Sequence, residues 1–401
     1  MAAQLRYTPA SASEVEGIVR EAAADRCSLA ICGGGSKRLM WLQEAAATLD
    51  MSAVAGITDY DPDELVVTAL AATPLAEIET ALAQRQQMLA FEPFDHGPLF
   101  GEATGRATLG GIVAGNVSGP RRISAGAARD HILGFSAVSG RGEAFKGGAA
   151  VVKNVTGFDL PKLMAGSWGT LAVLTSLTLR VLPLPRAEKT LLFRNLDGED
   201  AGGVMTRAMA SRAAVSSAAH LCSDGIAGLR IEGFGPSVDS RCLELSRAFG
   251  DAGTPEVIEA DESRAFWRRL RALEMLPTGA HALWRISLPP ATAWKLTDAL
   301  EAAGAHCVAD WAGGLVWAAL PEAEMEVESR ETSIPKLAAA HAGHAVLVRA
   351  PPEKRRANDR AVASGAAAAS DEALRQLQSR VKAAFDPLGI LNPGLIPGAG
   401  R

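Results

Sequence analysis

Apolar residues at helical spacing open the chain and lead into a short apolar strand. Val15, Ile18, Val19 and Ala22 fall on one helical face. Ser13 and Glu16 have the spacing of an N-terminal capping box. The run SLAIC at 28–32 then predicts a strand, which ends at three consecutive glycines.

The pattern continues with a strand over 64–70 and a helix that begins at Thr73-Pro74, with Thr73 as the cap and Pro74 in the first turn. Further along, Leu177, Leu179 and Val181 alternate with polar residues, which predicts a half-buried strand ended by prolines.

The pattern of apolar and small residues along the chain changes after residues 183–188, and we therefore predict a domain boundary there. Beyond it, short apolar strands such as 190–196, 228–234, 282–289 and 314–320 alternate with amphipathic helices. This order predicts an α+β domain with an antiparallel sheet. A last helix, with Leu374, Leu377 and Val381 on one face, precedes the turn-rich end FDPLGILNPG.

Composition narrows the classes of protein that this chain can be. Its 401 residues predict two or three domains, and 48% hydrophobic with 21% charged residues is ordinary for a globular protein. A formal net charge of −5 argues against a nucleic-acid partner. No secretory signal and no apolar run long enough for a membrane span is visible. The 5 cysteines form no CxxC pair, so we expect reduced thiols and no iron–sulfur or zinc site.

The glycines in AICGGGSKRL, residues 30–39, suggest a phosphate cradle. The Walker A pattern fails because Ser36, not glycine, precedes Lys37, and the Rossmann pattern fails because Arg38 occupies its third glycine position. A nest of backbone N–H groups over Gly33–Ser36 is the third option, with a plain structural turn as its alternative. In either case, we expect the charged side chains of Lys37 and Arg38 to face solvent.

A second glycine region strengthens the cradle hypothesis. Residues 97–170 are dense in small side chains, and TLGGIVAGNVSG places several of them within twelve positions. Glycine at this density is typical of tight turns or of backbone that approaches a ligand closely. Two such loops could hold a diphosphate from two sides.

These segments, in this order, resemble the FAD-binding family of vanillyl-alcohol oxidase type, also called PCMH-type. The resemblance covers roughly residues 10–185 and the last 30 residues, through GGGS, TLGG…AGNVSG, GSWGTLAVLTSLTLRVLPLP and FDPLGILNPG. Within the family, residues 119–171 resemble the small FAD-binding subunits of bacterial glycolate oxidases. The resemblance implies a two-subdomain FAD-binding domain at 1–185 with an internal boundary near 55, a smaller α+β cap at 186–370 with an antiparallel sheet, and a return to the first domain at 371–401.

The family pattern also implies which positions bind FAD. The diphosphate would lie on Gly33, Gly34, Gly35 and Ser36. Its second side and the ribityl chain would meet Thr108, Gly110, Gly111, Asn116, Ser118 and Gly119. Pro93 would lie beside the flavin, and the ring or adenine would meet the backbone of Gly169, Thr170, Leu171 and Val173. Because no Tyr or His stands where the family attaches flavin covalently, we expect non-covalent FAD.

Catalytic residues are less well indicated. Related dehydrogenases of 2-hydroxy acids carry HxGDGNxH in the cap, whereas this chain has HAGHAVLV at 341–348, so a two-histidine metal site is not expected there. His344, Arg349 and Arg122 are the remaining weak candidates. A cation such as Arg122 or Arg121 near the flavin would stabilise its reduced, anionic form.

The resemblance implies an FAD-dependent oxidoreductase acting on a CH–OH group. The specific expectation is the FAD-binding subunit of a multi-subunit glycolate dehydrogenase, which converts glycolate to glyoxylate and passes electrons to a partner iron–sulfur subunit beside a larger catalytic flavin subunit. Such a chain is cytoplasmic and reaches the inner membrane only through its partners. The alternatives are a stand-alone FAD enzyme for another small alcohol or 2-hydroxy acid, and a structural subunit with a degenerate FAD site.

Overall fold

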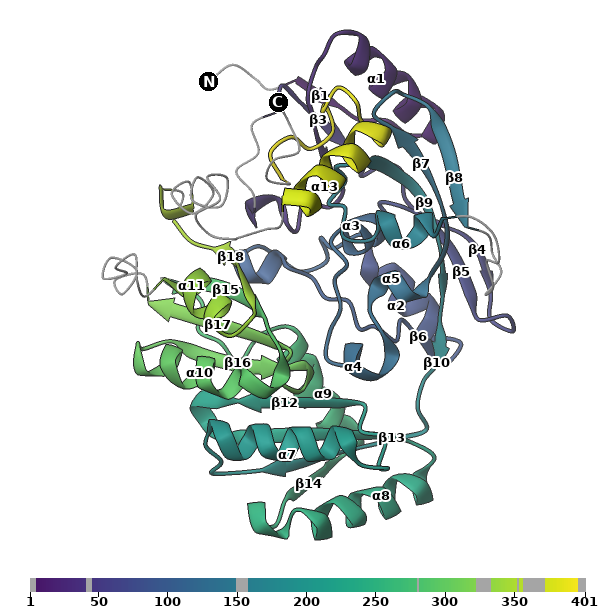
Figure 1. Ribbon diagram of the computed structural model, residues 1–401. Coiled ribbons are helices and arrows are strands. Elements are labelled where there is room, and N and C mark those ends of the chain that lie inside the picture. The colour runs from purple at the N-terminus through teal and green to yellow at the C-terminus, as the bar shows by residue number, and fades with distance from the viewer. Residues whose placement is uncertain are drawn as a thin grey trace. The chain divides into compact units, whose positions relative to one another are not determined.

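The described part of the chain forms two compact units, which contain four β-sheets (Figure 1). The computed structural model describes residues 5–40, 45–148, 158–279, 281–321, 333–351, 353–355 and 372–395. Unit 1 comprises the described residues of Met1–Ser118, Gly126–Pro183 and Arg360–Arg401. Unit 2 comprises those of Gly119–Ala125 and Leu184–Asp359. The segment AAVVKNVTG at 149–157 belongs to the motif region but lies outside the described residues.

Unit 1 contains a small parallel sheet and a larger antiparallel sheet. The parallel sheet has the order β1-β3-β2, with strands β1 (Leu5–Tyr7), β2 (Leu29–Cys32) and β3 (Ala47–Asp50). The antiparallel sheet has the order β4-β5-β9-β7-β8, with strands β4 (Ile57–Asp61), β5 (Val66–Leu70), β7 (Ile132–Ser139), β8 (Ala144–Gly148) and β9 (Ala172–Arg180). A two-stranded pair joins β6 (Gln87–Met88) and β10 (Leu182–Pro183). The predicted strands at 28–32, 64–70 and 177–181 are thus confirmed.

The described helices of unit 1 are α1 (Ala12–Ala24), α2 (Leu75–Ala83), α3 (Leu109–Ala114), α5 (Ala128–His131), α6 (Leu160–Met164) and α13 (Glu372–Phe385), with 3-10 turns η1 (Arg38–Met40) and η2 (Gly97–Phe100). The cap of α1 differs from the prediction, because Ser11 rather than Ser13 accepts from the N–H of Glu14. Thr73 does not cap α2 either: its hydroxyl donates to the carbonyl of Leu70, inside the preceding turn.

Unit 2 is built on one antiparallel sheet with the order β14-β11-β13-β12-β16-β17-β15-β18. Its strands are β11 (Ala187–Phe193), β12 (Ser217–Leu221), β13 (Ile226–Gly233), β14 (Glu256–Glu259), β15 (His281–Ser287), β16 (His306–Asp310), β17 (Leu315–Pro321) and β18 (His344–Arg349). Its described helices are α4 (Arg122–Ala125), α7 (Gly198–Ala210), α8 (Gly235–Ala248), α9 (Ala260–Arg271), α10 (Ala293–Ala302) and α11 (Ile334–Ala340). The 3-10 turns are η3 (Cys222–Asp224), η4 (Gly250–Ala252), η5 (Pro290–Thr292) and η6 (Trp311–Gly313). The predicted α+β class with an antiparallel sheet is confirmed.

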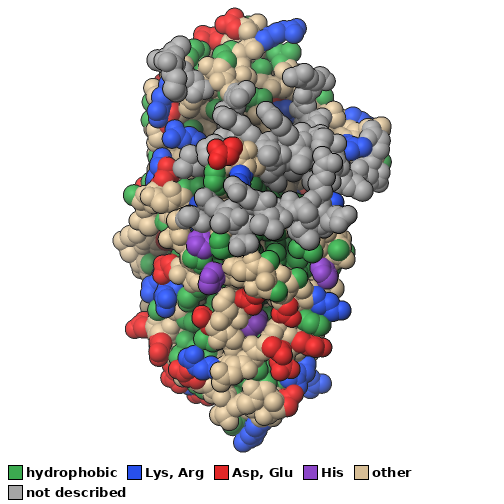
Figure 2. Space-filling view, turned by 90° about the vertical axis from the view of Figure 1, so that its left-hand side faces the viewer, with side chains coloured by type: hydrophobic (Ala, Val, Ile, Leu, Met, Phe, Trp, Pro, Cys, Tyr) green, Lys and Arg blue, Asp and Glu red, His purple; other side chains and the backbone are tan. Residues whose placement is uncertain are grey.

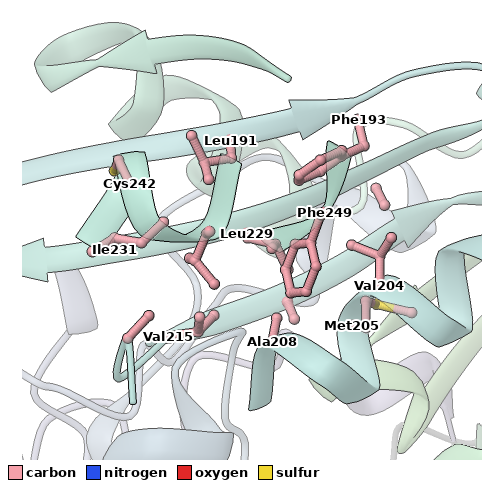
Figure 3. Packing of buried hydrophobic residues seen from close by; sticks show 14 of the residues in the cluster. Leu191, Phe193, Val204, Met205, Ala208, Val215, Leu229, Ile231, Cys242 and Phe249 are labelled. Carbon is pink, nitrogen blue, oxygen red and sulfur yellow. The ribbon is translucent and has the colours of Figure 1, made fainter. Parts of the chain in front are cut away.

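Strand alternation explains why helices pack on this sheet. Alternate residues of β11 and β13, such as Leu191 and Leu229, meet Val204 and Met205 of α7 in one buried cluster (Figure 3). Figure 3 also shows Phe249, at the end of α8, within this cluster. Burial of apolar surface at about 25 cal/mol per Å² is the main favourable term here.

The surface of the described residues carries mixed charge. On the face drawn in Figure 2, acidic and basic side chains are interspersed, and no basic stripe is visible among the described residues of that face. No described helix combines the length and the apolar character that crossing a membrane requires.

Candidate functional site

A cavity of about 410 Å³ lies within unit 1, where β2 ends and α3 begins. Four stretches far apart in sequence line it: the loop after β2, the start of α3, the start of β9 and the C-terminal turn. The lining residues are Arg6, Ala30–Arg38, Thr48, Met51, Ala71, Ala72, Thr108, Gly110, Gly111, Ala114, Trp168, Gly169, Ala172, Leu174, Asn392 and Leu395. The volume is in the range typical of cofactor pockets.

The loop Gly33–Lys37 presents unpartnered backbone donors to this cavity. Within the described part of the chain, none of its five N–H groups has a protein acceptor. The N–H of Arg38 donates to the carbonyl of Gly35, and that of Met40 donates to the carbonyl of Lys37. Gly35 has a positive φ of 78°, which glycine adopts without steric cost. Ser36 is buried and the other four residues are half-buried, so these N–H groups are open to an acceptor in the cavity. An anionic oxygen ligand would supply that acceptor.

Close approach to another loop explains the glycines at 33 and 34. A Cβ on Gly34 would lie 1.9 Å from the carbonyl oxygen of Arg106, and one on Gly33 would lie 2.6 Å from Oγ1 of Thr108. Asp95 holds that second loop, because its Oδ2 accepts from the N–H groups of Arg106 (2.8 Å) and Ala107 (3.2 Å). The glycines therefore bring the β2 loop against the start of α3, which places both at one cavity.

Lys37 is a functional candidate that sequence reasoning missed. Its side chain lines the cavity and was expected to need only solvent. Its Nζ contacts Oγ of Ser36 at 3.5 Å, and no carboxylate of the described residues lies within ion-pair distance. Burial of the ammonium lowers its pKa to about 8, although Asp95 acts in the opposite direction. A half-buried lysine beside five open N–H groups is suited to a phosphate.

The C-terminal turn fixes the other wall of the cavity. Oδ1 of Asn392 accepts from the N–H of Ile31 at 2.7 Å, and its Nδ2 donates to the carbonyl of Trp168 at 2.7 Å. Trp168 and Gly169 both have positive φ, at 54° and 70°, so the chain turns sharply where it meets Asn392. One amide side chain thus ties the β2 strand to the turn before β9.

A buried ion pair is hydrogen-bonded to the backbone of this C-terminal turn. Lys382 of α13 pairs with Asp386, and its Nζ also donates to the carbonyl of Leu391 at 3.1 Å. Asp386 in turn accepts from the N–H groups of Ile390 (3.1 Å) and Leu391 (2.8 Å). Its carboxylate side chain is 0% exposed, so every lone pair must be met by the protein.

The structure gathers eight of the sequence-predicted cofactor residues at the cavity and leaves seven outside it. Those that line it are Gly33, Gly34, Gly35, Ser36, Thr108, Gly110, Gly111 and Gly169. Those outside its lining are Pro93, Asn116, Ser118, Gly119, Thr170, Leu171 and Val173.

Strand alternation accounts for the difference in β9. Val173 is fully buried in the cluster that contains Val15 and Leu49, whereas its neighbours Ala172 and Leu174 line the cavity. Successive side chains of a strand point to opposite faces, so the side chain of Val173 points away from the cavity. The expected contact of FAD with the backbone at this position stays a prediction.

The small residues at 116–119 have structural partners. Oδ1 of Asn116 accepts from the N–H of Arg129 at 3.1 Å, and Oγ of Ser118 accepts from the N–H of Ala128 at 3.0 Å, so both position the start of α5. Gly119 belongs to unit 2, where its carbonyl accepts from Nε1 of Trp311 at 3.0 Å. Pro93 is buried, and its neighbour Asp95 is the residue that anchors the cavity loop.

The three catalytic candidates lie in unit 2, but only two share a neighbourhood. Arg349 donates to the carbonyls of His281 (3.1 Å) and Pro277 (3.3 Å), which indicates a structural role. Arg122 lies over the ring of Trp311, and Arg285 lies over the same ring.

His344 is the second member of that neighbourhood. It pairs with Ser287 across β15 and β18. Burial of its imidazole lowers its pKa, and Arg285 lowers it further. Much of the residue's surface is nevertheless exposed.

Arg121, the neighbour of Arg122, belongs to a separate buried network. Its Nε donates to Oε2 of Glu232 at 2.9 Å, and Glu188 lies 3.6 Å from its Nη2. Burial would raise the pKa of Glu232, but its hydrogen bonds with Arg121 and the charge of Arg230 hold that pKa below its usual range. Burial raises the pKa of Glu188 to about 7. The charge of Arg121 is therefore met by carboxylates within unit 2.

Comparison with known proteins places the whole chain in a family. A family described as "FAD binding domain" matches residues 3–148. The chain is 34% identical over 382 residues to glycolate oxidase subunit GlcE of Escherichia coli (strain K12), covering 94% of each chain. It is 36% identical over 143 residues to a D-lactate dehydrogenase of Anaerostipes hadrus, covering 35% of this chain and 28% of that protein.

A solved structure has a similar fold. The structure of p-cresol methylhydroxylase with substrate bound aligns with a TM-score of 0.72 over 99% of this chain and 88% of that chain, at 15% identity, a level that shows the fold alone. The long match to GlcE carries the family assignment. The chain therefore belongs to the PCMH-type FAD-binding flavoprotein family that includes glycolate oxidase subunit GlcE.

Proposed function

We propose that this chain is the FAD-binding subunit of a multi-subunit glycolate dehydrogenase and that its cavity holds the FAD diphosphate. The observation that carries the proposal is the match to GlcE, which spans 94% of both chains and so includes both units. The five N–H groups of Gly33–Lys37, which find no acceptor among the described residues, supply a chemical reason for a bound anion at this place.

Different residues of the cavity would bind FAD in different ways. Backbone N–H groups of Gly33–Ser36 would bind diphosphate oxygens, and the ammonium of Lys37 would balance their charge. Gly110 lets α3 pack against Ala71, because an added Cβ would lie 2.9 Å from the Cβ of that residue, and Gly111 keeps the space beside Thr108 and Lys37 clear of a side chain. Asn392 and Trp168 keep the opposite wall in place. When bound, FAD supplies the acceptor for the two electrons that leave the α-carbon of the hydroxy acid.

The proposal also includes a complex with partner subunits. The relative is named as a subunit, and none of the 5 cysteines in this sequence forms a CxxC pair of the kind that holds an iron–sulfur cluster. We therefore assign electron transfer onward to a partner iron–sulfur subunit, and place a larger flavin subunit beside this chain. Non-covalent binding of FAD belongs to the same proposal.

Purification of the full chain tests the proposal in two steps. First, the protein should carry flavin absorbance that is released by acid or denaturant, because the cofactor is not covalently attached. Second, glycolate oxidation with an artificial acceptor should require co-expression with the two partner subunits. A colourless protein would support the structural-subunit alternative, and full glycolate turnover by the chain alone would support the stand-alone enzyme; either result contradicts the proposal.

A further inference from the structure

A tryptophan belongs to the lining of the cavity in unit 1. Trp168 lies in the turn before β9 and lines the cavity together with the loop Gly33–Lys37. The tip of its ring lies beside Gly115, because a Cβ added there would be 3.4 Å from Cη2 of Trp168. Gly115 follows Gly111, which lines the cavity, by four positions, so the two share one face of α3. The indole therefore lies along the side of α3 that borders the cavity.

The backbone at Trp168 is strained, although glycines stand close to it on both sides. Its positive φ of 54° is in a region that bulky side chains rarely occupy, whereas Gly166 and Gly169 adopt positive φ without steric cost. Two hydrogen bonds hold this conformation: the N–H of Trp168 donates to the carbonyl of Ala114 at 2.9 Å, and its carbonyl accepts from Nδ2 of Asn392 at 2.7 Å. Strain of this kind is concentrated at ligand sites, which directs attention to the indole itself.

The cavity combines a phosphate cradle with an aromatic and apolar wall. The five N–H groups of Gly33–Lys37, which have no acceptor among the described residues, are open to phosphate oxygens. Trp168, Ala172 and Leu174 supply the aromatic and apolar part of the same lining. A ligand that satisfies both parts carries phosphate and a flat ring, as nucleotides do. Stacking of such a ring on an aromatic side chain contributes strongly to nucleotide affinity.

We propose that the indole of Trp168 stacks on a flat ring of the nucleotide whose phosphates bind to Gly33–Lys37. Trp168 is then a specificity-determining residue, because a ligand that consists of phosphate alone gains nothing from the indole, whereas a nucleotide does. The identity of the nucleotide as FAD rests on the proposed function, whereas stacking on a nucleotide ring does not.

Titration of the full-length, flavin-free chain tests this role with four probes. They are FAD, ADP and FMN, which each carry one of the two rings of FAD, and inorganic pyrophosphate, which carries none. Trp168→Leu removes the aromatic ring and should weaken FAD binding about 10-fold or more, while the affinity for pyrophosphate stays within about twofold of wild type. Whichever of ADP and FMN loses affinity together with FAD carries the ring that stacks on the indole.

Three further variants separate loss of stacking from loss of folding. Trp168→Phe keeps an aromatic ring, so its affinity for FAD should stay within about threefold of wild type, while FAD quenches less tryptophan fluorescence because this indole is gone. Trp168→Gly removes the ring but fits the left-handed backbone, so it should fold and bind FAD as weakly as Trp168→Leu. Trp294→Leu replaces a half-buried indole of α10 outside the cavity lining; it is the matched control and should bind all four probes as wild type does.

Three results would overturn the inference. The first is an affinity for FAD within about twofold of wild type in Trp168→Leu or Trp168→Gly, when circular dichroism shows that the variant is folded. The second is a loss of pyrophosphate affinity as large as the loss of FAD affinity, since the indole would then act only by holding the loop Gly33–Lys37 in place. The third is undiminished quenching of tryptophan fluorescence by FAD in Trp168→Phe, a measurement that needs no ring-less variant to fold.

The choice of probes separates this inference from the proposed function. If ADP binds in a manner that depends on Trp168 but the chain binds no FAD, stacking on a nucleotide stands and the proposed function fails. If the chain binds FAD and the assembled complex oxidises glycolate while Trp168→Leu binds FAD as tightly as wild type does, the proposed function stands and the stacking role fails.

Discussion

Replacement of Gly34 by alanine is the sharpest test of the cavity as a diphosphate site. The new Cβ would lie 1.9 Å from the carbonyl oxygen of Arg106, at least 1.1 Å short of the 3.0 Å that real Cβ atoms keep from such neighbours. The carbonyl cannot retreat freely, because the N–H of Arg106 is bound to Asp95 at 2.8 Å and its Nε donates to the carbonyl of Gly34 at 3.0 Å. The loop Gly33–Lys37 must therefore move by about 1 Å relative to the start of α3.

The expected loss of affinity follows from the donors that move. A hydrogen bond to a charged group contributes about 1.5–3 kcal/mol, so misplacing two N–H groups removes about 3 kcal/mol or more. That loss corresponds to a roughly 100-fold weaker Kd for FAD. Overpacking itself lowers the free energy of unfolding by about 1–3 kcal/mol, which a protein of this size can tolerate.

The assay is the flavin-to-protein ratio after purification, followed by titration of the apoprotein with FAD under flavin-fluorescence detection. Gly17→Ala is the matched control, since Gly17 lies within α1 of the same unit and its added Cβ would meet nothing within 4 Å. That control should retain FAD and gain up to about 1 kcal/mol of helix stability. If Gly34→Ala binds FAD as tightly as wild type, the loop Gly33–Lys37 is not the diphosphate site.

Three further predictions concern the residues that support the two units. Asn392→Ala removes the 2.7 Å bonds to Ile31 and Trp168, and should lower the free energy of unfolding by about 1–3 kcal/mol and weaken FAD binding about tenfold; unchanged values in urea unfolding and FAD titration would contradict the positioning role. Lys382→Met leaves the buried carboxylate of Asp386 without its cation and should cost about 3–5 kcal/mol in urea unfolding, whereas a loss under about 1 kcal/mol would show that the pair is dispensable. Burial raises the pKa of Glu188 from 4.5 to about 7, so between these values the folded state keeps a proton that the unfolded chain releases, and stability falls as pH rises. Glu188→Gln should therefore gain up to about 3 kcal/mol relative to wild type between about pH 5 and pH 8, and an equal difference at both pH values would refute this reasoning.

Local sequence patterns predicted much of the secondary structure but not all of it. The strands β9 and β15 overlap the segments that the apolar pattern predicted, although β9 begins earlier, at Ala172. The helix α7 and the strand β12 were not predicted, because AGGVMTRAMA and SAAHL are built from small residues that give little periodic signal. Their burial depends on neighbours that are distant in sequence, among them Leu191 and Leu229.

At the candidate site too, some residues were predicted from the sequence and others were not. The sequence by itself predicted either tight turns or closely approached backbone at Gly33–Gly35, Gly110 and Gly111, because glycine allows both. Lys37 and Asn392 became visible only in three dimensions. A lysine after a serine has no distinguishing local pattern, and Asn392 acts on Ile31 across 361 positions of sequence.

Periodicity and glycine content are properties of neighbouring residues, so the sequence could determine the class of those elements that have a clear apolar period, the glycine loops and, through their order, the family. Which face of β9 meets the cavity, which residues surround Arg285, and which side chain closes the site depend on how distant segments pack. Those choices rest on contacts between residues that are far apart in the chain, and only the tertiary structure decided them.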